Sequence, residues 1–175
     1  MDKALAYNLY ELYRKEMGEC FRIHQESLQH YLAFASAILG ATILGILQIQ
    51  GWGWAGLVIL SGPILNSFIC VLGIRMCNRF YLGALERIAL TAKLEHVLGL
   101  QEPILIPDRS DNIAFPGDEH LLPERWLAGR KHSTTTEFVK RNMKSGVNRL
   151  ATWTFRLLIA VNVLLGVAII IVAFK

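Results

Sequence analysis

The sequence predicts an all-α integral membrane protein with three transmembrane helices and additional amphipathic helices on the cytoplasmic side. Two long stretches of the 175 residues, positions 27–74 and 157–174, contain no Asp, Glu, Lys or Arg. Charged residues make up only 18% of the chain, whereas they make up about a quarter of an average soluble domain. An ionised side chain at the bilayer centre costs about 2.5–3.5 kcal/mol. The charge-free stretches therefore indicate membrane spans.

The N-terminal part, residues 1–30, is predicted to form a cytoplasmic amphipathic helix. Leu5, Leu9 and Leu12 fall on one face at helical spacing, and charged residues lie mostly off that face. The first span is predicted at residues 31–49, whose length as a helix is about 28 Å, close to the hydrocarbon thickness. Nothing between the two segments breaks a helix, so we expect one to run into the other.

The second span is predicted at residues 54–74, after a short uncharged Gly- and Trp-containing turn. Pro63 near its middle predicts a kink, because proline removes a backbone donor and clashes with the preceding turn. Arg75 marks the predicted end of this span, and a separate helix is expected at residues 77–99. Gly99 is its predicted C-cap.

Residues 77–152 are predicted to be a cytoplasmic helical region. Within it, residues 101–132 contain four of the five prolines but are too apolar for a disordered linker. We expect an ordered, irregular segment that packs on the cytoplasmic helices or on a neighbouring subunit. Thr134 and Glu137 form a capping-box pattern, so a helix should begin there and continue into the third span at residues 153–174.

The distribution of charge predicts the orientation. Of the 18 basic residues, 17 lie on the side of the N-terminus and the middle region, and only Lys175 lies on the other. By the positive-inside rule, the N-terminus is cytoplasmic and the C-terminus is outside the cell inner membrane. All 14 acidic residues are also on the cytoplasmic side. A partner would therefore be recognised from the cytoplasm or within the bilayer.

Small residues recur at every fourth position of the first span: Ala33, Ala37, Ala41 and Gly45. Lipid provides no hydrophobic drive for helix association, so close backbone approach at small residues must supply the packing. This pattern predicts a helix–helix interface. The sequence leaves open whether the interface lies within one chain or between copies of a homo-oligomer.

Three polar side chains are predicted to lie well inside the membrane: Thr42, Asn66 and Asn162. An unpaired amide in hydrocarbon is costly, so each should find a partner. Interhelical hydrogen bonds are the favoured interpretation, and a polar lining for a pore or ion path is the alternative. The absence of charged residues in mid-membrane argues against a proton-coupled pump or a carrier of charged substrates.

A basic run next to the third span comprises Lys140, Arg141, Lys144 and Arg149. It should attract anionic lipid headgroups by about 1 kcal/mol per charge, although such a run equally serves to set the topology. It lacks the interleaved aromatic residues that stack on bases, so we do not expect nucleic-acid binding.

No catalytic or metal-binding motif is present in the sequence. His24 and His30 are six residues apart, which places them on different helix faces, and the three cysteines have no metal-ligand spacing. Hydrolase, nucleotide-binding and zinc-peptidase signatures are absent. We therefore expect no cofactor and no metal, and a protein that is not an enzyme.

The layout of residues 5–100 resembles that of SLATT-type membrane proteins of prokaryotic conflict systems. An amphipathic helix enters a two-span hairpin, and a helix from Asn78-Arg79-Phe80-Tyr81 to Glu95-His96-Val97-Leu98-Gly99-Leu100 follows. The third span departs from that pattern. The resemblance implies membrane permeabilisation after a partner senses infection. We thus expect a self-associating membrane protein that receives a cytoplasmic signal or partner, in its sharpest form a pore-forming effector; the alternative is an anchoring subunit of a larger complex.

Overall fold

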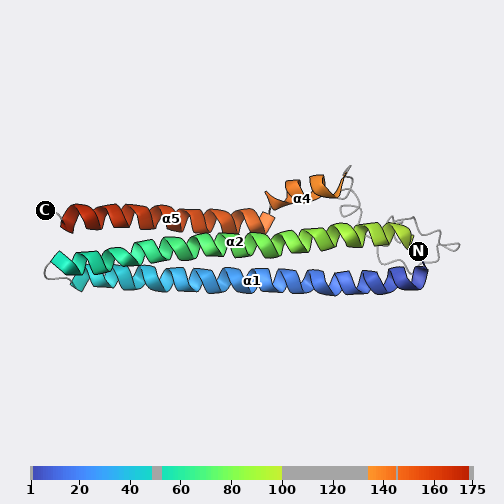
Figure 1. Cartoon of the computed structure of the whole chain (residues 1–175), viewed down its shortest axis with the longest axis horizontal. Coiled ribbons are helices and arrows are strands. Elements are labelled where there is room, and N and C mark those ends of the chain that lie inside the picture. The colour runs from blue at the N-terminus through green and yellow to red at the C-terminus, as the bar shows by residue number, and fades with distance from the viewer. Residues whose placement is uncertain (1, 49–52, 100–133, 145, 174–175) are drawn as a thin grey trace, which may run out of the picture. The chain divides into compact units, whose positions relative to one another are not determined.

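The computed structural model consists of α-helices, and no strand occurs in the part it describes, residues 2–48, 53–99, 134–144 and 146–173 (Figure 1). The helices are α1 (Lys3–Gln48), α2 (Gly53–Val97), α4 (Thr135–Met143) and α5 (Gly146–Ala173). The predicted all-α class is confirmed.

Three of these helices, α1, α2 and α5, are long and apolar enough to cross a membrane. Their exposure pattern is the reverse of that in a soluble protein. Asn66 and Asn162 are buried, with 0% and 1% of their surface exposed, while Leu47 and Leu164 are 75% and 70% exposed. In water, large exposed apolar surfaces are costly and buried amides are rare. The protein is therefore built for an apolar solvent, and the prediction of three spans is confirmed in length and composition.

One compact unit comprises Phe21–Tyr81 and Lys144–Lys175 and contains the apolar parts of the three long helices. We call it the span unit. Its core residues are Ala35, Cys70, Cys77 and Phe155. Buried positions recur every seven residues, as in helices that pack along a seam. These positions are Gly56, Pro63, Cys70 and Cys77 in α2, and Asn148, Phe155, Asn162 and Ile169 in α5.

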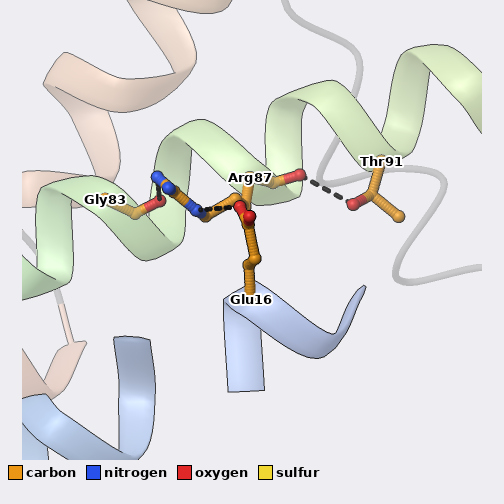
Figure 2. A network of polar contacts seen from close by, with 4 residues as sticks. All are labelled: Glu16, Gly83, Arg87 and Thr91. Atoms are coloured by element: carbon orange, nitrogen blue, oxygen red, sulfur yellow. Dashed lines mark hydrogen bonds and ion pairs between the residues drawn. The ribbon is translucent and has the colours of Figure 1, made fainter. Parts of the chain in front are cut away.

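The second unit comprises Met1–Cys20 and Leu82–Met143, with the beginning of α1, the end of α2 and α4. Arg87 links its two longer helical parts (Figure 2). The guanidinium Nε of Arg87 donates to Glu16 Oε2 at 3.0 Å, and its Nη1 donates to the Gly83 carbonyl at 3.3 Å. Thr91 Oγ1 donates to the Arg87 carbonyl one turn later. Because 32% of the Arg87 side chain and 41% of the Glu16 side chain are exposed, this ion pair contributes at most about 1 kcal/mol.

The helix boundaries differ from the predicted ones at Arg75. Helix α1 is continuous, as predicted, but α2 also runs without interruption through Arg75 to Val97. The expected separation of a span from a helix beginning at residue 77 is therefore wrong. Arg75 needs a more polar environment than the apolar residues before it, but it does not interrupt the helical hydrogen bonds of α2. Gly99 has φ 77° and donates its N–H to the His96 carbonyl, so its predicted role as a C-cap is confirmed.

The second difference lies before the third span. The N–H of Glu137 donates to Thr134 Oγ1 at 3.1 Å, so the predicted N-cap is confirmed. The helix does not continue into the span, however, because α4 ends at Met143 and α5 begins at Gly146 with φ 62°. This left-handed backbone suits glycine and interrupts a helix. The segment predicted at residues 101–132 lies outside the described residues.

Candidate functional site

A buried amide pair joins α2 to α5 inside the membrane stretch. Asn66 Nδ2 donates to Asn162 Oδ1 at 3.1 Å, and Asn162 Nδ2 donates to the Leu158 carbonyl at 2.8 Å. Within the described residues, Asn66 Oδ1 has no hydrogen-bond partner. The predicted interhelical hydrogen bond is thus confirmed for these two residues, which satisfy three of the four polar groups of the pair.

A second amide pair joins the same helices closer to the α4 end of α5. Asn148 Nδ2 donates to Asn78 Oδ1 at 2.9 Å. On α2 this pair lies twelve residues from Asn66, which corresponds to about 18 Å along the axis. Asn78 and Asn148 were not predicted as a pair from the sequence. The available signal was the seven-residue repeat of Asn148, Phe155 and Asn162.

Between the two amide pairs, the Phe155 ring packs directly on the backbone of Gly73. A Cβ atom added at Gly73 would lie 2.7 Å from Phe155 Cζ and 3.1 Å from the Cβ of Tyr31. Phe155 is fully buried. Glycine is therefore required at position 73 for α1, α2 and α5 to meet at this level, in keeping with close approach at small residues in membrane helices. Together, the two amide pairs and this contact form what we call the α2–α5 seam.

Helices α1 and α2 approach each other closely at Thr42. Its hydroxyl donates to the Ile38 carbonyl at 2.8 Å, and a Cβ atom at Gly62 would overlap it. The predicted interhelical bond of Thr42 is therefore wrong, because its hydroxyl bonds within α1. Pro63 lies inside α2, which stays α-helical on both sides of it. A Cβ atom at Gly166 would lie 4.0 Å from the Pro63 ring, so α5 also packs at this point.

The row of small residues on α1 does not pack within the chain as a whole. Ala33, Ala37 and Ala41 are exposed, and Gly45 lies near Ile59 of α2. Gly40 is next to this row, and an added Cβ atom there would meet open space. The exposure of the three alanines leaves this face of α1 accessible to another helix. An interface between copies stays a prediction.

His24 is a buried polar residue at the end of the span unit. Its Nδ1 lies 3.1 Å from the Cys77 carbonyl, which can only accept, so Nδ1 donates. Its Nε2 is buried and has no partner among the described residues, and the ring centroid lies 5.5 Å from that of Tyr81. Cys77 and Tyr81 lie beyond the predicted end of the second span. Burial raises the pKa of the Cys77 thiol to about 11 and also raises the pKa of Tyr81, so both stay protonated at neutral pH.

The four basic residues predicted to bind headgroups, Lys140, Arg141, Lys144 and Arg149, are all exposed. They are divided between the two units, because the first two belong to α4 and the others to the span unit. Exposure is consistent with lipid contact, which stays a prediction.

The described residues contain no group of three or more His, Cys, Asp or Glu side chains that could hold a metal ion. No protein-family model, no curated protein and no solved structure matches this chain. The features of the described helices that bear on function are the hydrogen-bonded α2–α5 seam inside the chain and the exposed small-residue face of α1.

Proposed function

We propose that this protein is a non-enzymatic inner-membrane protein that self-associates through its spans and receives a signal or partner on its cytoplasmic face. In its sharpest form it is a pore-forming or membrane-perturbing effector. The observation that carries the proposal is the exposure of Ala33, Ala37 and Ala41, with open space at Gly40. A second helix can approach the α1 backbone closely at such a face, which is how membrane helices associate.

The interior of the span unit favours a path between copies over a path through one copy. Its buried amides bond across the α2–α5 seam, and the Phe155 ring fills the level between them. Permeation would therefore require an assembly in which the α1 faces of several copies meet. The resemblance in layout to SLATT-type effectors supports the same activity, as does the concentration of charged residues on one predicted side.

Self-association predicts a particle mass in detergent well above that of one 19.7 kDa chain. The double substitution Ala37→Leu and Ala41→Leu should shift the protein towards monomer, because leucine side chains hold the α1 backbones apart. The matched control is Ala160→Leu with Ala168→Leu, which places the same change at exposed positions of α5. A monomeric wild-type protein, or equal effects of the two double variants, would contradict the proposal. Light scattering of the purified protein measures this mass.

Permeabilisation predicts dye leakage from liposomes that contain the protein. Leakage should rise more steeply than linearly with the protein-to-lipid ratio, because several copies are needed for one path. The Ala37→Leu and Ala41→Leu variant should release less dye than the Ala160→Leu and Ala168→Leu control. Leakage equal to that of protein-free liposomes at every ratio would reject the effector.

The alternative function is an anchoring subunit of a larger complex. The observation in its favour is the exposure of Leu5 and Leu12, 52% and 49%, in the unit predicted to lie in the cytoplasm. A stable complex that is recovered with the wild-type protein and lost on Leu5→Glu with Leu12→Glu, in the absence of leakage, would support the anchor.

A further inference from the structure

A positively charged face with an aromatic residue at its centre lies at the start of the apolar stretch of α5. Arg149, Trp153 and Arg156 are spaced by four and three residues, which places them on one side of the helix. All three are exposed, Trp153 by 57%. The guanidinium carbon of Arg156 lies 5.9 Å from the centroid of the Trp153 ring. We call this the Arg–Trp–Arg face.

No negative side chain within α5 competes for these two guanidinium groups. Helix α5 contains no Asp or Glu along its whole length, and the ion pairs between described residues do not involve either arginine. Trp153 also attracts Arg156, since a guanidinium near the face of an indole makes a cation–π interaction. Among the described residues the face therefore has no anionic partner, which leaves its two positive charges available to an anion.

The two arginines lie at different depths relative to a phospholipid headgroup. Arg156 directly precedes the apolar run that begins at Leu157, so it lies at the hydrocarbon boundary, where a lipid carries its phosphate. Guanidinium groups bind phosphate strongly and with defined geometry. Arg149 lies two turns further towards water, about 10.5 Å along the axis. Arg149 therefore adds a second positive charge on the water side of the phosphate level.

We propose that the Arg–Trp–Arg face is a binding site for an anionic phospholipid, in which Arg156 holds the phosphate and Arg149 supplies a second positive charge that favours lipids of net negative charge. In a zwitterionic headgroup the ammonium group offsets the phosphate, so the attraction of the two arginines is largely cancelled. Phosphatidylglycerol has a neutral distal glycerol, so its negative charge is not offset. This site goes beyond the proposed function, since it depends only on α5 crossing the membrane.

Quenching of Trp153 by brominated lipids tests the site. The full chain carries Trp52→Phe, Trp54→Phe and Trp126→Phe, which leaves one tryptophan, and is placed in phosphatidylcholine bilayers. Brominated phosphatidylglycerol or brominated phosphatidylcholine is then added at equal mole fraction. We expect brominated phosphatidylglycerol to be enriched at Trp153 by roughly fivefold, the factor that one basic group at a membrane surface provides. A ratio of one would overturn the proposal.

Variants of Arg149 test its contribution to the binding of the anionic lipid. Arg149→Gln should lower the enrichment while leaving the quenching by pure brominated phosphatidylcholine unchanged, which shows that Trp153 stays at its depth. Arg149→Lys should retain the enrichment, because it keeps the charge. Arg14→Gln, an exposed change near the start of α1, is the matched control and should behave as wild type. If Arg149→Gln keeps full enrichment, the assignment of headgroup selection to this residue is wrong.

Discussion

Replacing Gly73 with alanine is expected to destabilise the span unit by about 1–3 kcal/mol, the usual cost of overpacking a filled core. The added methyl would lie 2.7 Å from one carbon of the Phe155 ring and 2.8 Å from another. The ring cannot move aside easily, because it is fully buried and part of the core with Ala35, Cys70 and Cys77. The α2–α5 seam would have to separate by a few tenths of an ångström at its middle.

The measurement is the free energy of unfolding from a titration with sodium dodecyl sulfate in mixed micelles. Gly18→Ala is the matched control, because the same methyl enters open space on a helix that also crosses the membrane, outside the α1 face proposed to meet other copies, and alanine favours the helix. Phe155→Leu provides the second test. Combined with Gly73→Ala it should cost less than the two single changes added together, because the smaller side chain frees the space that the methyl needs. Equal losses for Gly73→Ala and Gly18→Ala would show that Phe155 does not confine position 73.

The fold class and the three spans could be predicted because the cost of a charge in hydrocarbon is large. This cost leaves long stretches without charged residues, which can be recognised in the sequence whatever the local secondary-structure preference. The same signal does not locate the ends of helices. Arg75 ends an apolar stretch, yet α2 continues beyond it because nothing there removes a backbone hydrogen bond. Gly146, with a φ of 62°, is the first residue of α5 after the interruption that follows α4, and this backbone conformation cannot be predicted from the spacing of apolar and polar residues.

The packing faces were harder to predict than the spans. In water, a buried face is recognised by its hydrophobic period, but lipid is as apolar as a protein core, so both faces of a span look alike. This is why the regular spacing of Ala33, Ala37 and Ala41 did not show which face meets the rest of the chain. The stronger signal was in α2, where the small or proline residues Gly56, Pro63, Cys70 and Cys77 recur every seven positions and are buried. Polar residues in mid-membrane were the more reliable guide, because an unpaired amide must find a partner wherever it lies.

Replacing Asn162 with leucine is expected to cost more stability than the same change at Asn66, although the two side chains share one hydrogen bond. Without Asn162, the amide of Asn66 remains buried with no bonded group, since its Oδ1 already has no partner among the described residues. Without Asn66, Asn162 keeps its bond to the Leu158 carbonyl. A buried polar group left unpaired costs about 1–3 kcal/mol, so Asn162→Leu should fall near the upper end and Asn66→Leu near the lower end.

The double variant Asn66→Leu with Asn162→Leu turns this asymmetry into a test of function. Its loss of stability should be smaller than the sum of the single losses by about 0.6–1.7 kcal/mol, the coupling found for hydrogen bonds between membrane helices. If the pair serves only to hold α2 against α5, dye leakage per assembled particle should be unchanged wherever the double variant still assembles. If instead the amides line an ion path, leakage should fall although the particle mass is retained. The double variant therefore distinguishes an amide pair that only holds the two helices together from one that lines a pore, because only a pore-lining pair contacts the permeating ion.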